Sequence, residues 1–192
     1  MNENNLNVVY QQYFSKRKAD QIFEELEREI EYFPSEMTTV VFNKRYPVPR
    51  KVSAYGDKNL TYAFSGNTLP KKPLIPILIK FLKEANKFLK DGSFNYILVN
   101  RYKDGQDRIG SHRDNETDMD PNSSIVIFSF GAERTMIFKR PNFNFVKILL
   151  RNGSVLAMKP PTNEIWYHEI PREKKIKDVR ISLTFRKNLS KN

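Results

Sequence analysis

The sequence predicts an α+β fold that is mainly β, with helices in the first half of the chain and an antiparallel barrel or jelly roll in the second. Two observations predict this fold. Apolar residues recur every three or four positions in two segments before residue 91, as they do on one face of a helix. From residue 95 onward, short segments rich in β-branched and aromatic residues follow one another with no helical segment between them.

The first helix is expected to begin at Ser15, a candidate N-cap, and to end before Pro34. Between them Ala19, Ile22 and Leu26 mark the buried face. The dozen residues before this helix are polar, and we expect them to be loosely held. A second helix is expected over residues 73–90, where apolar residues have the same spacing.

Six strands are expected after the helices, at residues 96–102, 124–130, 135–139, 144–150, 154–158 and 179–186. The segment 37–69 contains the aromatic, proline and glycine residues that are typical of hairpins and loops. No interior linker divides the chain. We therefore expect one domain in three parts: an N-terminal segment and helix (1–36), a hairpin region (37–70), and a helix followed by the β-core (71–192).

The charge balance favours a polyanionic partner. Lys and Arg number 33 against 22 Asp and Glu, which gives a net charge of +11. Nucleic acid is the first expectation and an anionic membrane surface the second, while a merely soluble basic surface is the alternative. No apolar segment is long enough for a membrane helix and no secretory signal is evident, so we expect a soluble, intracellular protein that does not engage membranes.

The residue types restrict how a metal could be bound. The chain has no cysteine and two histidines, so a metal site would use imidazole and carboxylate groups. His112 and Asp114 are two positions apart, and in an extended segment their side chains point the same way. His168, on a later strand, could complete the set. Two imidazoles and one carboxylate suit a non-haem Fe(II) oxygenase, but by ligand type alone they could equally hold a catalytic zinc.

The last expected strand has one apolar and one polar face. Ile181, Leu183 and Phe185 would share the first, and the second would carry Arg180, Ser182, Thr184 and Arg186. Such a polar face either meets solvent or lines a polar pocket. The strand over residues 96–102 would likewise place Leu98, Asn100 and Tyr102 together. If both faces line one barrel, their arginine, amide and phenol groups could bind a dicarboxylate such as 2-oxoglutarate beside the metal.

A series of motifs runs through the chain in order: Asn100-Arg101-Tyr102-Lys103-Asp104-Gly105, His112-Arg113-Asp114, Ser129-Phe130-Gly131-Ala132, Pro161-Thr162-Asn163, Trp166-Tyr167-His168 and the strand from Arg180 to Arg186. The series resembles the AlkB family of Fe(II)/2-oxoglutarate dioxygenases over residues 37–187. The upstream motifs Val41-Phe42-Asn43-Lys44, Pro49-Arg50-Lys51, Tyr55-Gly56-Asp57 and Leu60-Thr61-Tyr62-Ala63-Phe64-Ser65-Gly66 are similar to those of the branch that repairs duplex DNA.

The resemblance implies a double-stranded β-helix that holds Fe(II) through His112, Asp114 and His168, with 2-oxoglutarate and O2 as co-substrates. It implies that 2-oxoglutarate is bound by Asn100, Tyr102, Arg180, Thr184 and Arg186. Arg180 would bind its distal carboxylate, and Arg186 would act nearer the metal. The implied activity is oxidative demethylation of N1-methyladenine and N3-methylcytosine in DNA, preferably duplex, with release of formaldehyde and succinate. A nuclear location follows if the source is eukaryotic.

The resemblance also implies how DNA would be bound. The segment 37–70 would be a nucleotide-recognition and base-flipping region, with Phe42 as a wedge that fills the space of the extruded base. The extruded base would meet Tyr62, Phe64, Asn115 and Glu116; the family has an acidic residue where this chain has Asn115. Backbone contacts are expected from Lys44, Arg50, Lys51, Arg172, Lys174 and Lys175. Core packing of the aromatic residues and ordinary solvated positions for the charged ones remain the alternatives.

Two other functions stay open. A demethylase of single strands or RNA would use the same fold, and a damage-binding module would have the same surfaces with a vestigial or zinc-filled metal site. No obligate protein partner is implied, and we expect a monomer.

Overall fold

The structure of the 192-residue chain is a computed structural model. It describes residues 2–34, 38–41, 44–56, 61–64, 67–90, 93–114 and 118–189, with the backbone alone for residues 2, 38–41, 44–45, 61–64 and 67–70. None of the helices in these segments is long and apolar enough to cross a membrane.

The two expected helices are present. Helix α1 (Lys16–Glu29) begins where the Ser15 hydroxyl accepts a hydrogen bond from the Lys18 backbone N–H, and it ends before Ile30, whose backbone is already extended. Helix α2 (Pro76–Phe88) starts with proline in its first turn, where a missing N–H leaves no hydrogen bond unmade. Both helices are shorter than the sequence predicted.

Two antiparallel sheets form the body of the protein. The major sheet has the strand order β1 (Asn2–Glu3), β2 (Leu6–Gln12), β13 (Ser154–Met158), β10 (Ile125–Gly131), β15 (Arg180–Arg186), β8 (Tyr96–Tyr102) and β5 (Lys51–Gly56). The minor sheet has the order β12 (Val146–Leu150), β11 (Arg134–Lys139), β14 (Tyr167–Ile170) and β9 (Ile109–His112). A short helix, α3 (Thr162–Ile165), precedes β14. The predicted α+β, mainly β jelly-roll class is confirmed.

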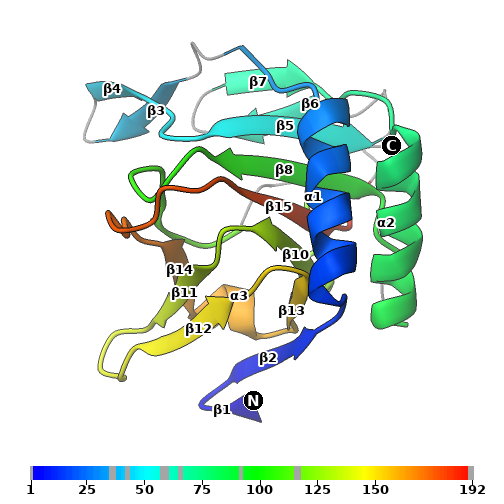
Figure 1. Ribbon diagram of the computed structural model, residues 1–192. Coiled ribbons are helices and arrows are strands. Elements are labelled where there is room, and N and C mark those ends of the chain that lie inside the picture. Colours follow the sequence, from blue (N-terminus) through cyan, green and yellow to red (C-terminus); the bar gives the residue numbers. More distant parts are fainter. Residues whose placement is uncertain are drawn as a thin grey trace.

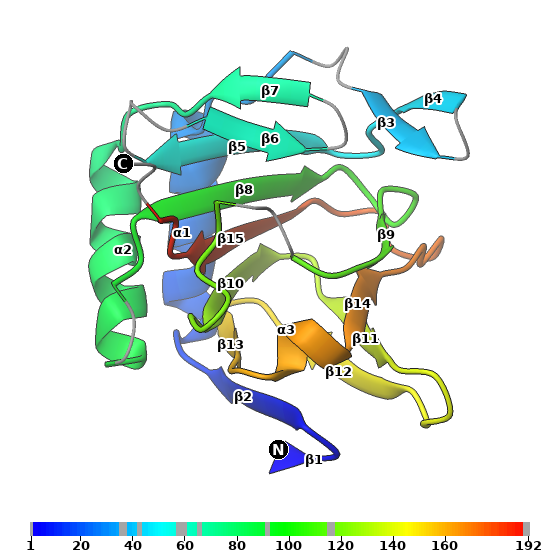
Figure 2. The same ribbon diagram turned by 180° about the vertical axis from the view of Figure 1, so that it is seen from behind.

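The segment between the two helices forms two hairpins, as the sequence predicted for residues 37–70, but it also contributes β5 to the edge of the major sheet, which the sequence did not predict. The hairpins are β3 (Thr38–Val41) with β4 (Lys44–Pro47), and β6 (Thr61–Phe64) with β7 (Asn67–Pro70). In both ribbon views, the β3–β4 hairpin lies on the same side of the molecule as the loop between β14 and β15 (Figures 1 and 2).

The prediction that the first dozen residues are loosely held is wrong. Strand β2 pairs with β13 along its length, from Gln12 opposite Ser154 to Val8 opposite Met158. Leu6 and Val8 are almost fully buried in the core between the sheets. Two apolar residues at a spacing of two are enough for a strand when an open sheet edge is available to pair with it.

The strands of the major sheet separate two different environments. Helices α1 and α2 cover one face (Figure 1), and the minor sheet faces the other (Figure 2). On β15, Ile181, Leu183 and Phe185 pack into the cluster that contains the helices. The alternate residues of β15 therefore point between the two sheets, where the candidate site lies.

Candidate metal centre

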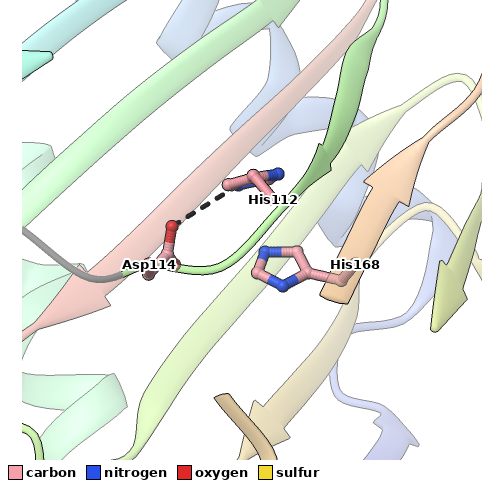
Figure 3. Close-up of side chains that lie close together, drawn as sticks. All are labelled: His112, Asp114 and His168. Carbon is pink, nitrogen blue, oxygen red and sulfur yellow. Dashed lines mark ion pairs between the residues drawn. The ribbon is translucent and has the colours of Figure 1, made fainter. Parts of the chain in front are cut away.

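Three side chains that could bind a metal converge between the sheets. His112 ends β9, Asp114 follows it by two residues, and His168 lies on β14. One ligand atom from each lies within 4.8 Å of the others, and the three side chains point toward one another (Figure 3). The grouping predicted from the sequence is therefore present in space.

The register of the minor sheet explains this convergence. His168 is the direct cross-strand partner of His112, which brings the centroids of the two imidazole rings to 4.3 Å. Asp114 Oδ1 lies 3.5 Å from His112 Nε2. Directly paired residues project from the same face of a sheet, so neither histidine could turn away without a shift of register.

Backbone groups and an asparagine hold two of the three side chains in place. His112 Nδ1 donates to the Gly110 carbonyl at 2.9 Å, because a carbonyl can only accept, and this turns Nε2 toward Asp114. The Asp114 N–H donates to Asn163 Oδ1 at 2.9 Å, while Asn163 Nδ2 donates to the Asp114 carbonyl. Asn163 thus grips the Asp114 backbone at two points.

The electrostatics keep Asp114 and His168 in the protonation states of metal ligands. Burial alone would raise the pKa of Asp114, but the Arg186 guanidinium 2.6 Å away and the two imidazoles hold it well below its usual range. Burial lowers the pKa of His168 to about 3, and the neighbouring His112 and Arg186 act in the same direction. An ionised carboxylate and a neutral imidazole are the forms that coordinate a cation.

These residues fit an Fe(II) ion. The donors are two imidazoles and one carboxylate on one side of the site, which is the ligand set of non-haem iron oxygenases. Within the described part of the chain, the buried His168 Nδ1 also has no hydrogen-bond partner. The set contains no thiolate, which would favour a softer metal.

A polar pocket continues from the metal ligands along the major sheet. It is lined by the predicted co-substrate residues and their apolar neighbours, namely Leu98, Asn100, Tyr102, Ile109, Ile127, Met136, Ile170, Arg180, Ser182, Thr184 and Arg186. Arg180, Thr184 and Arg186 are all buried. The polar face of the last strand therefore lines a pocket, and of the two readings that the sequence left open, the solvent-exposed one is wrong.

Arg180 is a buried cation with unused donors. Its Nη2 donates to Ser129 Oγ at 2.9 Å and its guanidinium lies 5.1 Å from the centre of the Tyr102 ring. Its Nε and Nη1 have no hydrogen-bond partner among the described residues. Burial lowers the pKa of Arg180, and the nearby Arg134 adds to the effect. This surrounding favours an anion in the pocket.

The structure corrects the expected role of Arg50. Its side chain is buried, and Nε donates to Asn100 Oδ1 at 2.7 Å instead of reaching a surface phosphate. Arginine has no acceptor, so the bonded atom of Asn100 must be its oxygen and the Asn100 amide nitrogen is left to donate elsewhere. Arg50 and Lys51 are adjacent cations that were both expected to contact the DNA backbone, and residue type alone does not distinguish the buried one from its exposed neighbour.

Sequence reasoning also missed a second buried arginine. Arg134 forms an ion pair with Glu173 at 2.9 Å and donates to the backbone carbonyls of Asp104, Asp107 and Pro171. It joins the loop after β8 to the loop after β14. The same two loops are also in close contact at Gly105, where the Glu173 backbone leaves no room for a Cβ. An arginine in an alternating strand carries no sequence signal for such a role.

The remaining predicted site residues divide into two groups. Lys51, Arg172, Lys174 and Lys175 are exposed, the last three in the loop between β14 and β15. Phe42, Asn115 and Glu116 lie outside the described residues, as do the side chains of Lys44, Tyr62 and Phe64. The structure therefore does not test the predicted wedge or base pocket.

Comparisons with known proteins agree with this site. Residues 7–186 match the family model described as the 2OG-Fe(II) oxygenase superfamily. The chain is 46% identical to the mouse protein named "DNA oxidative demethylase ALKBH2" over 96% of this chain and 81% of the mouse protein. The human protein of that name is 44% identical over 96% of this chain and 74% of its own length.

Solved structures show the same fold. The structure of OsALKBH1 superposes with a TM-score of 0.61 at 19% identity, covering 96% of this chain and all of that one. A crystal structure of a 2OG-Fe(II) oxygenase family oxidoreductase from Burkholderia pseudomallei gives 0.60 at 16% identity, over 93% of this chain and 84% of that one.

Fold, site and comparisons define a dioxygenase that uses Fe(II) and 2-oxoglutarate. The chain belongs to the 2OG-Fe(II) oxygenase superfamily, and within it to the AlkB family that the sequence motifs indicated.

Proposed function

We propose that this dioxygenase is a DNA oxidative demethylase that removes the methyl group of N1-methyladenine and N3-methylcytosine, preferably in duplex DNA. The observation that carries the proposal is one buried pocket holding both a His-Asp-His ligand group and an arginine with unused donors. The name of the ALKBH2 relatives supplies the substrate class.

In this proposal, His112, Asp114 and His168 hold the iron. Iron and 2-oxoglutarate together supply the oxidation: one oxygen atom of O2 enters the N-methyl carbon, the other enters succinate, and CO2 is released. The hydroxymethyl product then loses formaldehyde and leaves the repaired base. Asp114 is held as a carboxylate by Arg186, and Asn163 fixes its backbone, so the ligand set is already arranged before a metal binds.

The co-substrate would lie along the polar face of β15 and β8. Arg180 binds its distal carboxylate in a charge-assisted hydrogen bond, with Tyr102 beside it, and Arg186 acts near the metal end. Asn100, oriented by Arg50, donates its amide N–H groups into the pocket, and Thr184 offers a hydroxyl.

The DNA would approach the side of the molecule where the β14–β15 loop and the β3–β4 hairpin lie (Figure 1). Exposed cations there, Lys51, Arg172, Lys174 and Lys175, are proposed phosphate contacts, as is Lys44. A base must leave the stack to reach a buried metal, so we propose Phe42 as the wedge and Tyr62, Phe64, Asn115 and Glu116 as contacts of the extruded base. We also propose a monomer, and a nuclear location if the cell has a nucleus, because DNA is the substrate.

The test is a demethylation assay. A duplex with one N1-methyladenine is incubated with enzyme, Fe(II) and 2-oxoglutarate, and mass spectrometry follows the loss of the methyl group together with succinate. Activity that is higher on the duplex than on the same single strand supports the proposal. Stoichiometric metal binding with no loss of methyl from any strand would contradict it.

The phosphate contacts can be tested with matched variants. Lys174→Gln with Lys175→Gln should reduce the salt dependence of duplex binding by about one log–log unit per true contact. Lys80→Gln with Lys83→Gln is the control, because these exposed lysines lie on α2, on the other side of the molecule (Figure 1). An equal change in both pairs would show a general charge effect and no localised contact.

A further inference from the structure

Cationic and aromatic side chains alternate across the outer face of the minor sheet. The Arg113 guanidinium lies 4.7 Å from the centre of the Tyr167 ring. Lys139 is the direct cross-strand partner of Tyr167, and its Nζ lies 5.2 Å from the centre of the Phe145 ring. We call these four side chains, Arg113, Tyr167, Lys139 and Phe145, the cation–aromatic row.

The two aromatic members of the row are exposed, and Arg113 and Lys139 are half-buried. The Phe145 side chain is 61% exposed and that of Tyr167 is 37% exposed, whereas their neighbours Phe138 and His168 are buried on the inner face. Arg113 stands between His112 and Asp114 in the chain, and its Nη1 donates to the Glu164 carbonyl. Two exposed aromatic rings on one face of a sheet, each beside a cation, are suited to contact another flat aromatic group.

The net charge of the row is small, so it does not bind a partner mainly by electrostatic attraction. Lys139 is already paired with Glu169 at 2.6 Å, so two cations and one carboxylate lie along it. Phosphate attraction alone would be weak here. The row can instead bind a partner through the exposed rings of Phe145 and Tyr167, each of which has a cation beside it.

The partner that suits this surface presents flat aromatic faces to Phe145 and Tyr167, with a weaker contribution from anionic groups near Arg113 and Lys139. Unpaired nucleotides do so, because base–aromatic stacking needs a base face that is not already covered. In a duplex each base is covered by its neighbours. Phe145 and Tyr167 are two strands apart, about 10 Å at ordinary interstrand spacing, so the row can take more than one nucleotide.

We propose that the cation–aromatic row binds single-stranded DNA by stacking unpaired bases on Phe145 and Tyr167. Arg113, at one end of the row, is adjacent in the chain to the metal ligands His112 and Asp114, so the row would hold unpaired nucleotides of the strand outside the metal pocket. That the bound strand is a substrate rests on the proposed demethylase function. Binding of single strands to the row does not depend on that function. The enzyme then accepts lesions in unpaired as well as paired regions, and its affinity for single strands grows with strand length.

The experiment measures binding of an unmodified, fluorescein-labelled twelve-nucleotide single strand to the full chain by anisotropy. Phe145→Ala should weaken binding about fivefold or more, and Phe145→Trp should retain it. Leu149→Ala is the matched control, because Leu149 is a comparably exposed apolar residue, 42% exposed, on the strand that follows Phe145. Binding of the matching duplex should change less than about twofold in all three variants.

A second readout separates this proposal from the demethylase proposal. A single-stranded trinucleotide with N1-methyladenine at its centre has one nucleotide on each side of the target. The native enzyme should demethylate the same lesion faster in a twelve-nucleotide strand than in this trinucleotide. Phe145→Ala should reduce that rate ratio, and Leu149→Ala should retain it.

Unchanged single-strand binding in Phe145→Ala would contradict the proposal that the row binds single strands, even if the enzyme demethylates DNA. An equal loss on duplex and single strand would also overturn it, because stacking on unpaired bases cannot produce that result. If Phe145→Ala loses single-strand binding but the native protein demethylates no substrate, the binding role of the row is supported and the demethylase function is contradicted.

Discussion

Replacement of Arg180 by methionine should stabilise the protein without co-substrate and abolish co-substrate binding. Arg180 is 1% exposed, and two of its nitrogen atoms, Nε and Nη1, have no hydrogen-bond partner among the described residues. Each buried unsatisfied donor costs about 1–3 kcal/mol. Removing these two donors should therefore stabilise the protein. Loss of the Ser129 hydrogen bond and of the Tyr102 contact offsets about 2 kcal/mol of that stabilisation.

The net expectation for Arg180→Met is a gain of about 2 kcal/mol in the free energy of unfolding, equivalent to a rise of roughly 4–8 °C in the unfolding temperature of a domain this size. Saturating 2-oxoglutarate at a hundred times its Kd should stabilise the native protein by about 2.7 kcal/mol and leave the variant unaffected. Differential scanning fluorimetry with and without 2-oxoglutarate measures both effects.

Arg134→Met is the matched control. Arg134 is buried to the same 1% exposure and also lies beside the Tyr102 ring, but its donors are used by Glu173 and by backbone carbonyls. Its removal leaves Glu173 without its cation, with hydrogen bonds from Thr135 alone among the described residues, and should destabilise the protein by about 3–5 kcal/mol. A lower unfolding temperature in Arg180→Met, or a 2-oxoglutarate shift that survives the substitution, would refute the reasoning.

Three further predictions concern the groups around the metal. Arg50→Leu frees the Asn100 amide to rotate and should raise the KM for 2-oxoglutarate about tenfold with a smaller change in kcat, measured by succinate release; it removes one charge-assisted hydrogen bond. Asn163→Ala releases the backbone of Asp114 and should weaken metal binding about 10–100-fold in a competition titration. His112→Ala should abolish turnover while leaving duplex affinity within about twofold, because no phosphate contact is lost.

Each of these predictions has an outcome that would contradict it. An unchanged KM in Arg50→Leu would show that Asn100 holds its orientation without Arg50. Native metal affinity in Asn163→Ala would mean that the β9 backbone alone fixes Asp114. Substantial turnover in His112→Ala would remove that residue from the ligand set.

Much of the fold followed from local patterns. Helical spacing located α1 and α2, and alternation located the later strands, because these periodicities arise from the backbone geometry of each element. Strand β2 was missed, since its seven residues carry only a short apolar alternation and pair with β13, far away in the sequence. The short strand β14 and helix α3 are likewise defined by their partners.

The chemical identity of the site was determined by the sequence itself. A chain with two histidines and no cysteine had few ways to hold a metal, and the order of its motifs placed it in the AlkB family. Tertiary structure decided which charged residues belong to the site. Arg50 turned inward to Asn100, and Arg134 became a buried link between loops. The reason is physical: residue type gives the chemistry of a side chain, but burial and partners depend on strands that meet only in the folded protein.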